Sequence, residues 1–343
     1  KYGTLSFFRL FSGTIKGNDA LQNVTRGHEE RMGSLMTVRG LTQFPLDAVH
    51  AGDIAVVAKL RETHTGHTLA SKGFGKQVTP PHFPMPIYAV ALHPRTQSDS
   101  AKMNEVLNTM TNADPTLKWR FDGAIKQAVL EGMGGTHLDV AVKRAERMGV
   151  GLDTSVPKVP YQETVTRSAT SVYRHKKQSG GHGQYGDVHL RLAPNERGAG
   201  YQFIDSIVGG VVPKQYIPHV DKGAFEALER GVISGHPVVD VIVELFFGSY
   251  HAVDSSEMAF KLAASKAIQK GVRDARPCLL EPIMEIAVMV PEEFMGDING
   301  DLNSRRGRIL GMDAVGGGRQ IIRANVPEAE VLRYSTELRS MTQ

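Results

Sequence analysis

The order strand–helix–strand–strand–helix–strand occurs once in full in this chain and returns in part near its end. It constrains the fold more than any other feature of the sequence. Alternating apolar residues mark strands, and apolar residues spaced three and four apart mark helices. The first copy predicts strands at Ile87–Leu92, Leu117–Phe121, Ile125–Leu130 and Gly149–Asp153, and helices at Ser98–Thr111 and His137–Met148. This βαββαβ order is typical of the ferredoxin-like fold.

The second copy starts after residue 279 and is shorter. It predicts strands at Ile283–Val290, 307–314 and 319–326, and helices at Glu292–Asn303 and Ala329–Leu338. The last strand of the pattern has no counterpart in the sequence given. We therefore expect a second ferredoxin-like unit that lacks this strand.

The N-terminal part of the chain follows an all-β pattern. Residues 1–75 contain short strand-like runs, such as Leu5–Phe11 and Ile54–Ala58, separated by turns that contain glycine. Short strands at regular spacing favour a small β-barrel. The prolines between Pro80 and Pro86 then predict a stiff linker, because proline fixes its own φ and restricts the residue before it.

Residues 154–277 mix the two patterns and predict an α/β block. We expect a helix at Pro218–Arg230, followed by a strand at 239–245 with Asp240 on its polar face. The segment Asp254–Glu257 fits a capping box, so Asp254 is the predicted N-cap of the next helix. The whole chain is then a multidomain α+β protein, with a barrel at 1–75, a ferredoxin-like domain at 76–153, the α/β block at 154–277 and a shortened ferredoxin-like domain at 278–343.

Composition indicates a soluble protein with an anionic partner. Charged residues make up 22% of the chain, the net charge is +4, and no apolar run is long enough to span a membrane. No signal peptide opens the sequence given, and the single cysteine, Cys278, rules out an intramolecular disulfide. We expect a cytoplasmic location.

A glycine-rich loop at Ser179–Gly186 is the main candidate for a binding site. It is preceded by a basic stretch with Lys176 and Lys177, and residues 167–197 contain six Lys or Arg against two acidic residues. Glycine lets the main chain approach a surface closely, so this loop suits a polyanion. The alternatives are a nucleotide site, since Gly181–Val188 fits GxGxxGxV, and a hairpin without a partner. The nucleotide alternative lacks the helix or the kinase motifs that it requires.

Three further clusters have weaker signals. His64 and His67 have the character of a metal pair, but no second ligand pair follows, which favours surface histidines. The segment Asp297–Asp301 lacks the glycine and glutamate of a calcium loop. Three arginines at Arg305, Arg306 and Arg308 suit phosphate contacts or a solvated basic turn. No motif of a self-contained catalytic site occurs.

Several longer segments carry a resemblance to a known family. They are Ser179–Gly186, Ile207–Lys214, Pro237–Val241, Ser249–His251, Val253–Lys261, Leu280–Met284 and Met295–Gly307. In these segments the chain resembles bacterial-type translation elongation factor G, the GTP-driven ribosomal translocase, over nearly its full length. The resemblance implies domains II to V of that family, with residues 154–277 as a domain IV similar to ribosomal protein S5 domain 2.

The resemblance also implies partners and site residues. Domain IV of the family enters the decoding region of the small ribosomal subunit, where its tip loops meet tRNA and mRNA, and domain V lies against the stalk base of the large subunit. Both tip loops would then lie at one exposed end of their domain. The implied RNA-binding residues are Lys176, Lys177, Gly180, Gly181, His182, Gly183, Gln184, Tyr185, Gly186, Tyr250, His251, Asn303, Arg305 and Arg306.

The resemblance places GTP and Mg²⁺ in a G domain that precedes domain II, and this sequence has neither GxxxxGK[ST] nor NKxD. No cofactor and no bound metal are therefore expected in the chain itself, and a monomer is expected. Three residues depart from the family pattern: His182, Gly135 and Ala252. They leave open whether the chain belongs to a translocase or to a ribosome-recycling or ribosome-protection factor of the same architecture.

Overall fold

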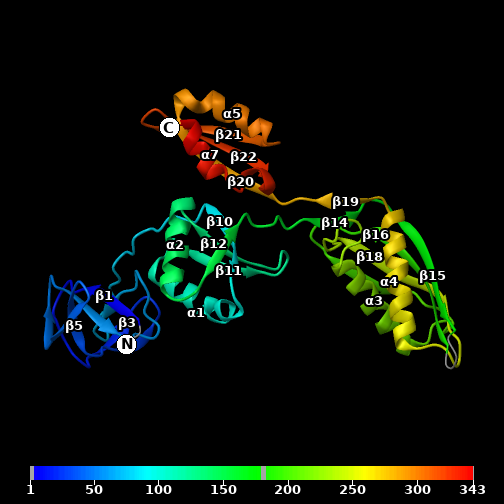
Figure 1. Ribbon diagram of the computed structural model, residues 1–343, viewed down its shortest axis with the longest axis horizontal. Coiled ribbons are helices and arrows are strands. Elements are labelled where there is room, and N and C mark those ends of the chain that lie inside the picture. Colours follow the sequence, from blue (N-terminus) through cyan, green and yellow to red (C-terminus); the bar gives the residue numbers. More distant parts are fainter. Residues whose placement is uncertain (1–3, 179–182, 343) are drawn as a thin grey trace. The chain divides into compact units, whose positions relative to one another are not determined.

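The computed structural model describes residues 4–178 and 183–342. Its chain divides into two compact units, one formed by residues 1–122 and 127–157 and the other by residues 123–126 and 158–343 (Figure 1). Each unit contains two hydrophobic cores, so four folded domains can be described separately.

The first domain is a small all-β barrel. Its strands are β1 (Leu5–Arg9), β2 (Thr14–Lys16), β3 (Ala20–Asn23), β4 (His28–Arg31), β5 (Leu35–Arg39), β6 (Thr42–Leu46), β7 (Ala48–His50), β8 (Ile54–Ala58) and β9 (Leu69–Ala70). They form three sheets, β1-β8-β5-β6, β2-β7 and β4-β3-β9. All three sheets supply side chains to one core, for example Ile15 from β2, Leu21 from β3 and Leu35 from β5. The predicted barrel is therefore confirmed.

The second domain has the predicted ferredoxin-like topology. Its elements are β10 (Tyr88–Pro94), α1 (Gln97–Ala113), β11 (Lys118–Asp122), β12 (Gln127–Gly132), α2 (Gly135–Arg147) and β13 (Leu152–Ser155). The sheet order β11-β12-β10-β13 is antiparallel throughout, as this fold requires. Thr96 caps α1 by accepting a hydrogen bond from the backbone N–H of Asp99.

The third domain is an α/β layer with two helices on one face of a four-stranded sheet (Figure 1). Its elements are β14 (Gln162–Val165), β15 (Ala169–Lys177), β16 (Gln184–Pro194), β17 (Tyr201–Asp205), η1 (Lys214–Tyr216), α3 (Ile217–Glu229), β18 (Val241–Ser249), α4 (Glu257–Asp274) and β19 (Pro277–Leu280). The main sheet has the order β15-β16-β18-β17, and β14 pairs with β19. The core lies between this sheet and the helices α3 and α4.

Two local predictions for this domain are wrong. Ser256, rather than Asp254, is the N-cap of α4, and its side chain accepts from the N–H of Ala259. Asp240 does not lie on the polar face of a strand, because β18 starts at Val241 and Asp240 is buried with φ +55°. Its carboxylate accepts the N–H groups of Gly198 and Gly200 and so closes the β16–β17 loop.

The fourth domain is a three-stranded antiparallel sheet with helices packed on it. Its elements are β20 (Ile283–Pro291), η2 (Glu292–Phe294), α5 (Met295–Ser304), β21 (Arg308–Gly316), β22 (Arg319–Pro327), α6 (Glu328–Val331) and α7 (Tyr334–Thr342). The single helix predicted at Ala329–Leu338 is two helices, which meet where Tyr334 enters the core. None of the helices in the described chain is both long and apolar enough to cross a membrane.

Candidate nucleic-acid interface

The candidate interface lies at the end of the β15–β16 hairpin. The register of this hairpin pairs Lys176 with Tyr185 and Lys177 with Gln184. Both lysines and Gln184 are exposed, and Tyr185 is half-buried. The predicted site residues Gly180, Gly181 and His182 lie outside the described residues.

The turn after β18 meets this hairpin directly. The backbone N–H of Tyr185 donates to the carbonyl of Asp254 over 2.8 Å, and the hydroxyl of Ser255 donates to the carbonyl of Tyr185 over 3.0 Å. The Asp254 carboxylate also accepts the N–H of Gly183 at 3.0 Å. The rings of Tyr185 and His251 are 6.2 Å apart. We call the surface formed by residues 176–177, 183–185 and 250–254 the apex; it joins the described end of the β15–β16 hairpin to the turn after β18.

His251 is held in one orientation by its own turn. Its ring Nδ1 accepts from the N–H groups of Val253 at 3.3 Å and Asp254 at 3.2 Å, and its backbone N–H donates to Ser255 Oγ. The neutral ring then carries its proton on Nε2. Within the described residues this nitrogen has no hydrogen-bond partner, and the side chain is 54% exposed. The Nε2–H group is therefore free to donate to a ligand.

Gly186, one of the predicted RNA contacts, is buried instead. A Cβ at this position would lie 2.9 Å from the carbonyl atoms of Ala259 in the first turn of α4. The glycine is needed because the strand and the helix approach so closely, and the residue is not available to RNA. The predicted contact at Gly186 is therefore corrected to a packing role.

A third segment, residues 207–216, reaches the same end of the domain. The Tyr216 hydroxyl donates to the carbonyl of Ser255 over 3.3 Å, and the Tyr216 ring stacks on Phe260 of α4. The segment exposes Lys214 and the apolar side chain of Val208, which is 82% exposed. From its sequence this segment contributed to the family resemblance alone. The adjacent glycines Gly209 and Gly210 could have indicated an exposed turn, and in the structure both have positive φ.

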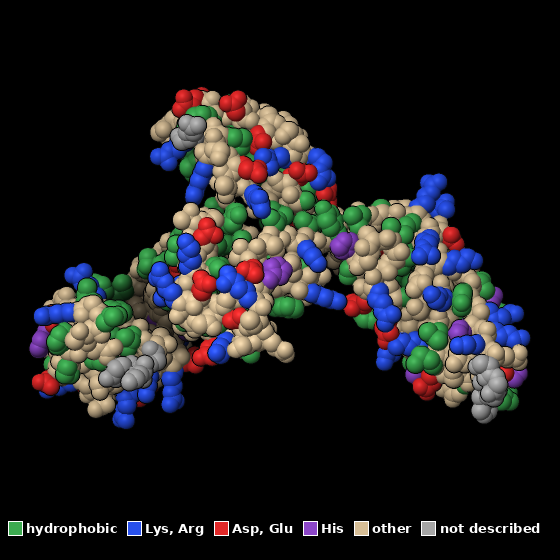
Figure 2. Space-filling view, in the orientation of Figure 1, with side chains coloured by type: hydrophobic (Ala, Val, Ile, Leu, Met, Phe, Trp, Pro, Cys, Tyr) green, Lys and Arg blue, Asp and Glu red, His purple; other side chains and the backbone are tan. Residues whose placement is uncertain are grey.

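Ion pairs neutralise three of the six basic side chains of residues 167–197. Arg174 pairs with Asp187, Arg191 with Glu244 and Arg197 with Asp240, at 3.1, 2.7 and 3.2 Å. Glu244 and Asp240 come from the segment around β18, so they lie outside residues 167–197, for which the charges were added up from the sequence. In the described chain, Lys176 and Lys177 have no ion-pair partner within 4.0 Å. Figure 2 shows Lys and Arg side chains along this domain.

Arg305 and Arg306, in the turn after α5, form ion pairs with acidic side chains of this part of the protein. Arg305 bonds bidentately to Asp301, reaches Glu337 at 2.7 Å and lies over the ring of Tyr334. Its side chain is only 19% exposed. Arg306 pairs with two glutamates, Glu281 and Glu330, while remaining 52% exposed. Asn303 is also exposed. Of the three predicted contacts in this turn, Arg306 and Asn303 are accessible and Arg305 is held inside.

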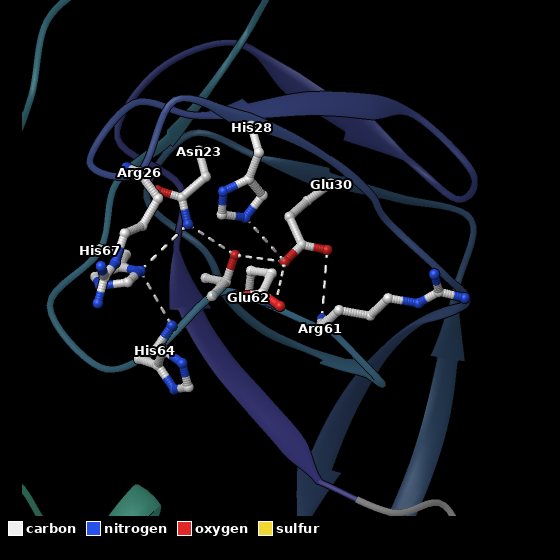
Figure 3. Close-up of polar contacts among 9 residues, drawn as sticks. Asn23, Arg26, His28, Glu30, Arg61, Glu62, His64 and His67 are labelled. Atoms are coloured by element: carbon white, nitrogen blue, oxygen red, sulfur yellow. Dashed lines mark hydrogen bonds and ion pairs between the residues drawn. The ribbon is translucent and has the colours of Figure 1, made fainter.

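The histidines of the barrel belong to a structural cluster (Figure 3). His67 Nδ1 accepts from the side chain of Asn23 and from the N–H of His64, and burial, reinforced by the charges of His64 and Arg26, lowers the pKa of His67. Beside it the buried Glu30 accepts the N–H of Glu62 at 2.8 Å. These bonds fix the loop before β9. No group of three or more His, Cys, Asp or Glu side chains in the described chain could hold a metal ion.

Four family models match most of the chain. Residues 3–70 match "Elongation factor Tu domain 2", 83–156 "Elongation Factor G, domain III", 157–276 "Elongation factor G, domain IV" and 278–343 "Elongation factor G C-terminus". An "Elongation factor G-like protein" of Thermotoga maritima is 43% identical over 341 residues, 99% of this chain and 50% of the relative. A crystal structure of a protein from Thermus thermophilus is similar with a TM-score of 0.79 and 39% identity, over 99% of this chain and 51% of that one. The chain thus spans about half the length of both relatives.

Proposed function

Because the chain belongs to the elongation factor G family of translation factors, we propose that it acts on the ribosome and that its third domain enters the decoding region of the small subunit. There the apex contacts tRNA and mRNA and favours their movement through the ribosome. The fourth domain contacts the stalk base of the large subunit through the exposed Asn303 and Arg306.

The observation that carries this proposal is the construction of the apex. Two segments about 70 positions apart in sequence are joined by backbone and side-chain hydrogen bonds into one exposed surface. That surface presents two lysines that have no ion-pair partner among the described residues, the amide of Gln184 and the Nε2–H of His251. Lysines bind phosphates without regard to sequence, while amide and imidazole groups bind base edges and riboses.

The proposed action is mechanical. A rigid apex that occupies a tRNA-sized site biases the position of the RNA without making or breaking a bond. GTP and Mg²⁺ do not fit the residues of this chain, which has no GxxxxGK[ST] motif. No step described for the apex depends on them. In an intact protein, a separate G domain would supply the energy of GTP hydrolysis.

The charge of the apex provides the test. We expect the double substitution Lys176→Gln/Lys177→Gln to weaken binding of the chain to ribosomes, because each lysine that contacts a phosphate releases a counterion. The slope of log K against log salt should become shallower by about two, one for each lysine. Binding is measured by co-sedimentation over a series of salt concentrations.

The matched control removes the same charge from one helix of the same domain. Lys266→Gln/Lys270→Gln changes two exposed lysines in the C-terminal half of α4, whose N-terminal end lies at the apex, and should leave the slope nearly unchanged. Equal slopes for the two double variants would mean that the apex does not contact RNA. In the intact protein, the apex variant should also slow translocation while GTP hydrolysis continues.

Ribosome recycling is a second candidate, because the departures at His182, Gly135 and Ala252 leave the role of the chain within the family open. An assay with the intact protein and ribosome-recycling factor separates the two functions. Subunit splitting without translocation would identify a recycling factor, whereas movement of tRNA and mRNA by one codon would identify a translocase.

A further inference from the structure

A buried carboxylate lies directly beneath the apex. Asp187 of β16 is 1% exposed, although it is ionisable. Its Oδ2 accepts from the guanidinium of Arg174 at 3.1 Å and from the hydroxyl of Ser249 at 2.9 Å. The Ser249 oxygen in turn lies 2.8 Å from the hydroxyl of Tyr185. A chain of hydrogen bonds therefore runs from Arg174 through Asp187 and Ser249 to Tyr185.

The chemistry of these groups determines which atom donates and which accepts in each of these three hydrogen bonds. A carboxylate paired with a guanidinium only accepts hydrogen bonds, so the single hydroxyl hydrogen of Ser249 is used toward Asp187. The Ser249 oxygen can then only accept from Tyr185. The hydrogen of the Tyr185 hydroxyl is consequently used inside the protein, and only the lone pairs of its oxygen remain.

We propose that this arrangement makes Tyr185 a specificity-determining residue of the apex, whose hydroxyl oxygen accepts a hydrogen bond from RNA and cannot donate one. The proposal rests on the proposed function, since it requires RNA at the apex. It assigns to Asp187 and Ser249 a positioning role, because they act on the ligand only through Tyr185.

An acceptor-only hydroxyl distinguishes between parts of a nucleic acid. Phosphate oxygens are acceptors and gain nothing from it, so Lys176 and Lys177 remain the phosphate contacts. The groups of an unpaired RNA that can donate to Tyr185 are the ribose 2′-hydroxyl, the exocyclic amines of the bases and the ring N–H groups of guanine and uracil. Ribose and base are thus two sources of one chemistry, and chemically substituted oligonucleotides separate them.

The experiment measures the affinity of the chain for a short unpaired RNA oligonucleotide of adenine and cytosine by fluorescence anisotropy, because these two bases donate hydrogen bonds only through their exocyclic amines. The same sequence is also prepared with 2′-deoxyribose and, separately, with bases that lack the exocyclic amines. The unsubstituted protein should bind RNA about 3- to 10-fold more tightly than the version without the donor that it uses. Discrimination against the 2′-deoxy form identifies the ribose, and discrimination against the amine-free form identifies the base.

Three variants test the origin of this discrimination. Tyr185→Phe removes the acceptor and should abolish it. Ser249→Ala frees the hydrogen of the Tyr185 hydroxyl to point outward, and Asp187→Asn allows an amide to donate to Ser249 and reverse the chain. Both should reduce the discrimination while Tyr185 stays in place. Ser249→Ala keeps the test valid if the buried substitution at Asp187 impairs folding.

Tyr161→Phe is the control, because Tyr161 contacts His236 at the opposite end of α3 from the apex. It should bind as the unsubstituted protein does. The proposal is overturned if the unsubstituted protein does not discriminate, or if Tyr185→Phe discriminates equally well. In either case, salt-dependent RNA binding that persists would leave the proposed function standing, whereas no RNA binding at low salt would contradict both.

Discussion

At the scale of single residues, Glu163 shows how one carboxylate organises a distant loop. It lies in β14 and is 1% exposed. It accepts the backbone N–H groups of Val232, Ile233 and Ser234 at 2.9, 3.0 and 2.7 Å, and the Ser234 hydroxyl as well. Burial raises the pKa of Glu163, but these bonds together outweigh burial and lower the pKa below its usual 4.5.

This pKa shift leads to a pH-dependent prediction. Because the folded-state pKa is depressed, the stabilisation is complete above the unfolded-state pKa of about 4.5 and is lost as the pH falls through the folded-state value. At neutral pH, Glu163→Gln replaces one acceptor oxygen with an NH₂ group that faces the same N–H donors, at a cost of about 1–3 kcal/mol. Hydrogen exchange of residues 232–234 should therefore be about 5- to 150-fold faster in the variant.

The comparison between variant and unsubstituted protein is made at each pH. The ratio of the exchange rate in Glu163→Gln to that in the unsubstituted protein should fall toward one in acid. Protonation of Glu163 in the unsubstituted protein then weakens its hydrogen bonds to residues 232–234. Glu229→Gln, an exposed glutamate at the end of α3, should show a ratio near one throughout. A constant ratio for Glu163→Gln at every pH would contradict the ionic origin of the effect.

At the scale of elements, the two helices of the third domain approach each other at Gly223. This residue of α3 is buried against α4, and a Cβ added here would overlap the backbone carbonyl of Lys261. Helix propensity favours alanine over glycine by about 1 kcal/mol. Steric overlap with the backbone of Lys261 opposes this preference for alanine. The overlap is the larger effect, because a backbone carbonyl cannot move to another rotamer as a side chain can.

We therefore expect Gly223→Ala to destabilise the third domain by about 1–3 kcal/mol. The matched control is Gly300→Ala in α5, where a Cβ would meet nothing within 4 Å, and it should stabilise the fourth domain by up to about 1 kcal/mol. Calorimetry of the whole chain resolves the sign of each change. A higher melting temperature for Gly223→Ala would show that the helices can move apart.

At the scale of the whole molecule, each domain has its own core, and a long segment joins the first domain to the second. In the described chain, residues 71–87 contain no helix or strand. Residues 71–80 are exposed throughout. A segment with few contacts opens to proteases far more readily than the strands beside it.

Brief trypsin digestion should therefore cut first after Lys72 or Lys76, neither of which precedes a proline. N-terminal sequencing of the large product should begin at Gly73 or Gln77. Lys72→Gln/Lys76→Gln should delay the separation of the barrel from the remaining domains. First cleavage within residues 88–155 would instead mean that the ferredoxin-like domain opens before the linker does.

The local order of elements was available from the sequence because it depends on neighbouring residues. The face of α1 that carries Met103, Val106, Leu107 and Met110 is buried as expected, since a period of 3.6 residues identifies it directly. The ferredoxin-like topology followed from the order of such segments. The apex residues were found through the glycine-rich loop and the resemblance.

Only the tertiary structure decided which polar groups are partners. Asp254 was expected to cap α4 and instead binds the N–H of Gly183, and Arg305 was expected at the surface and lies between Asp301 and Tyr334. Asp187 and Ser249 are 62 positions apart, yet they share a hydrogen bond. Sequence periodicity indicates which apolar side chains are buried, because their burial follows a repeating local pattern. Hydrogen bonds and ion pairs between distant residues have no such period, so they are set only when the sheet and helices bring those residues together.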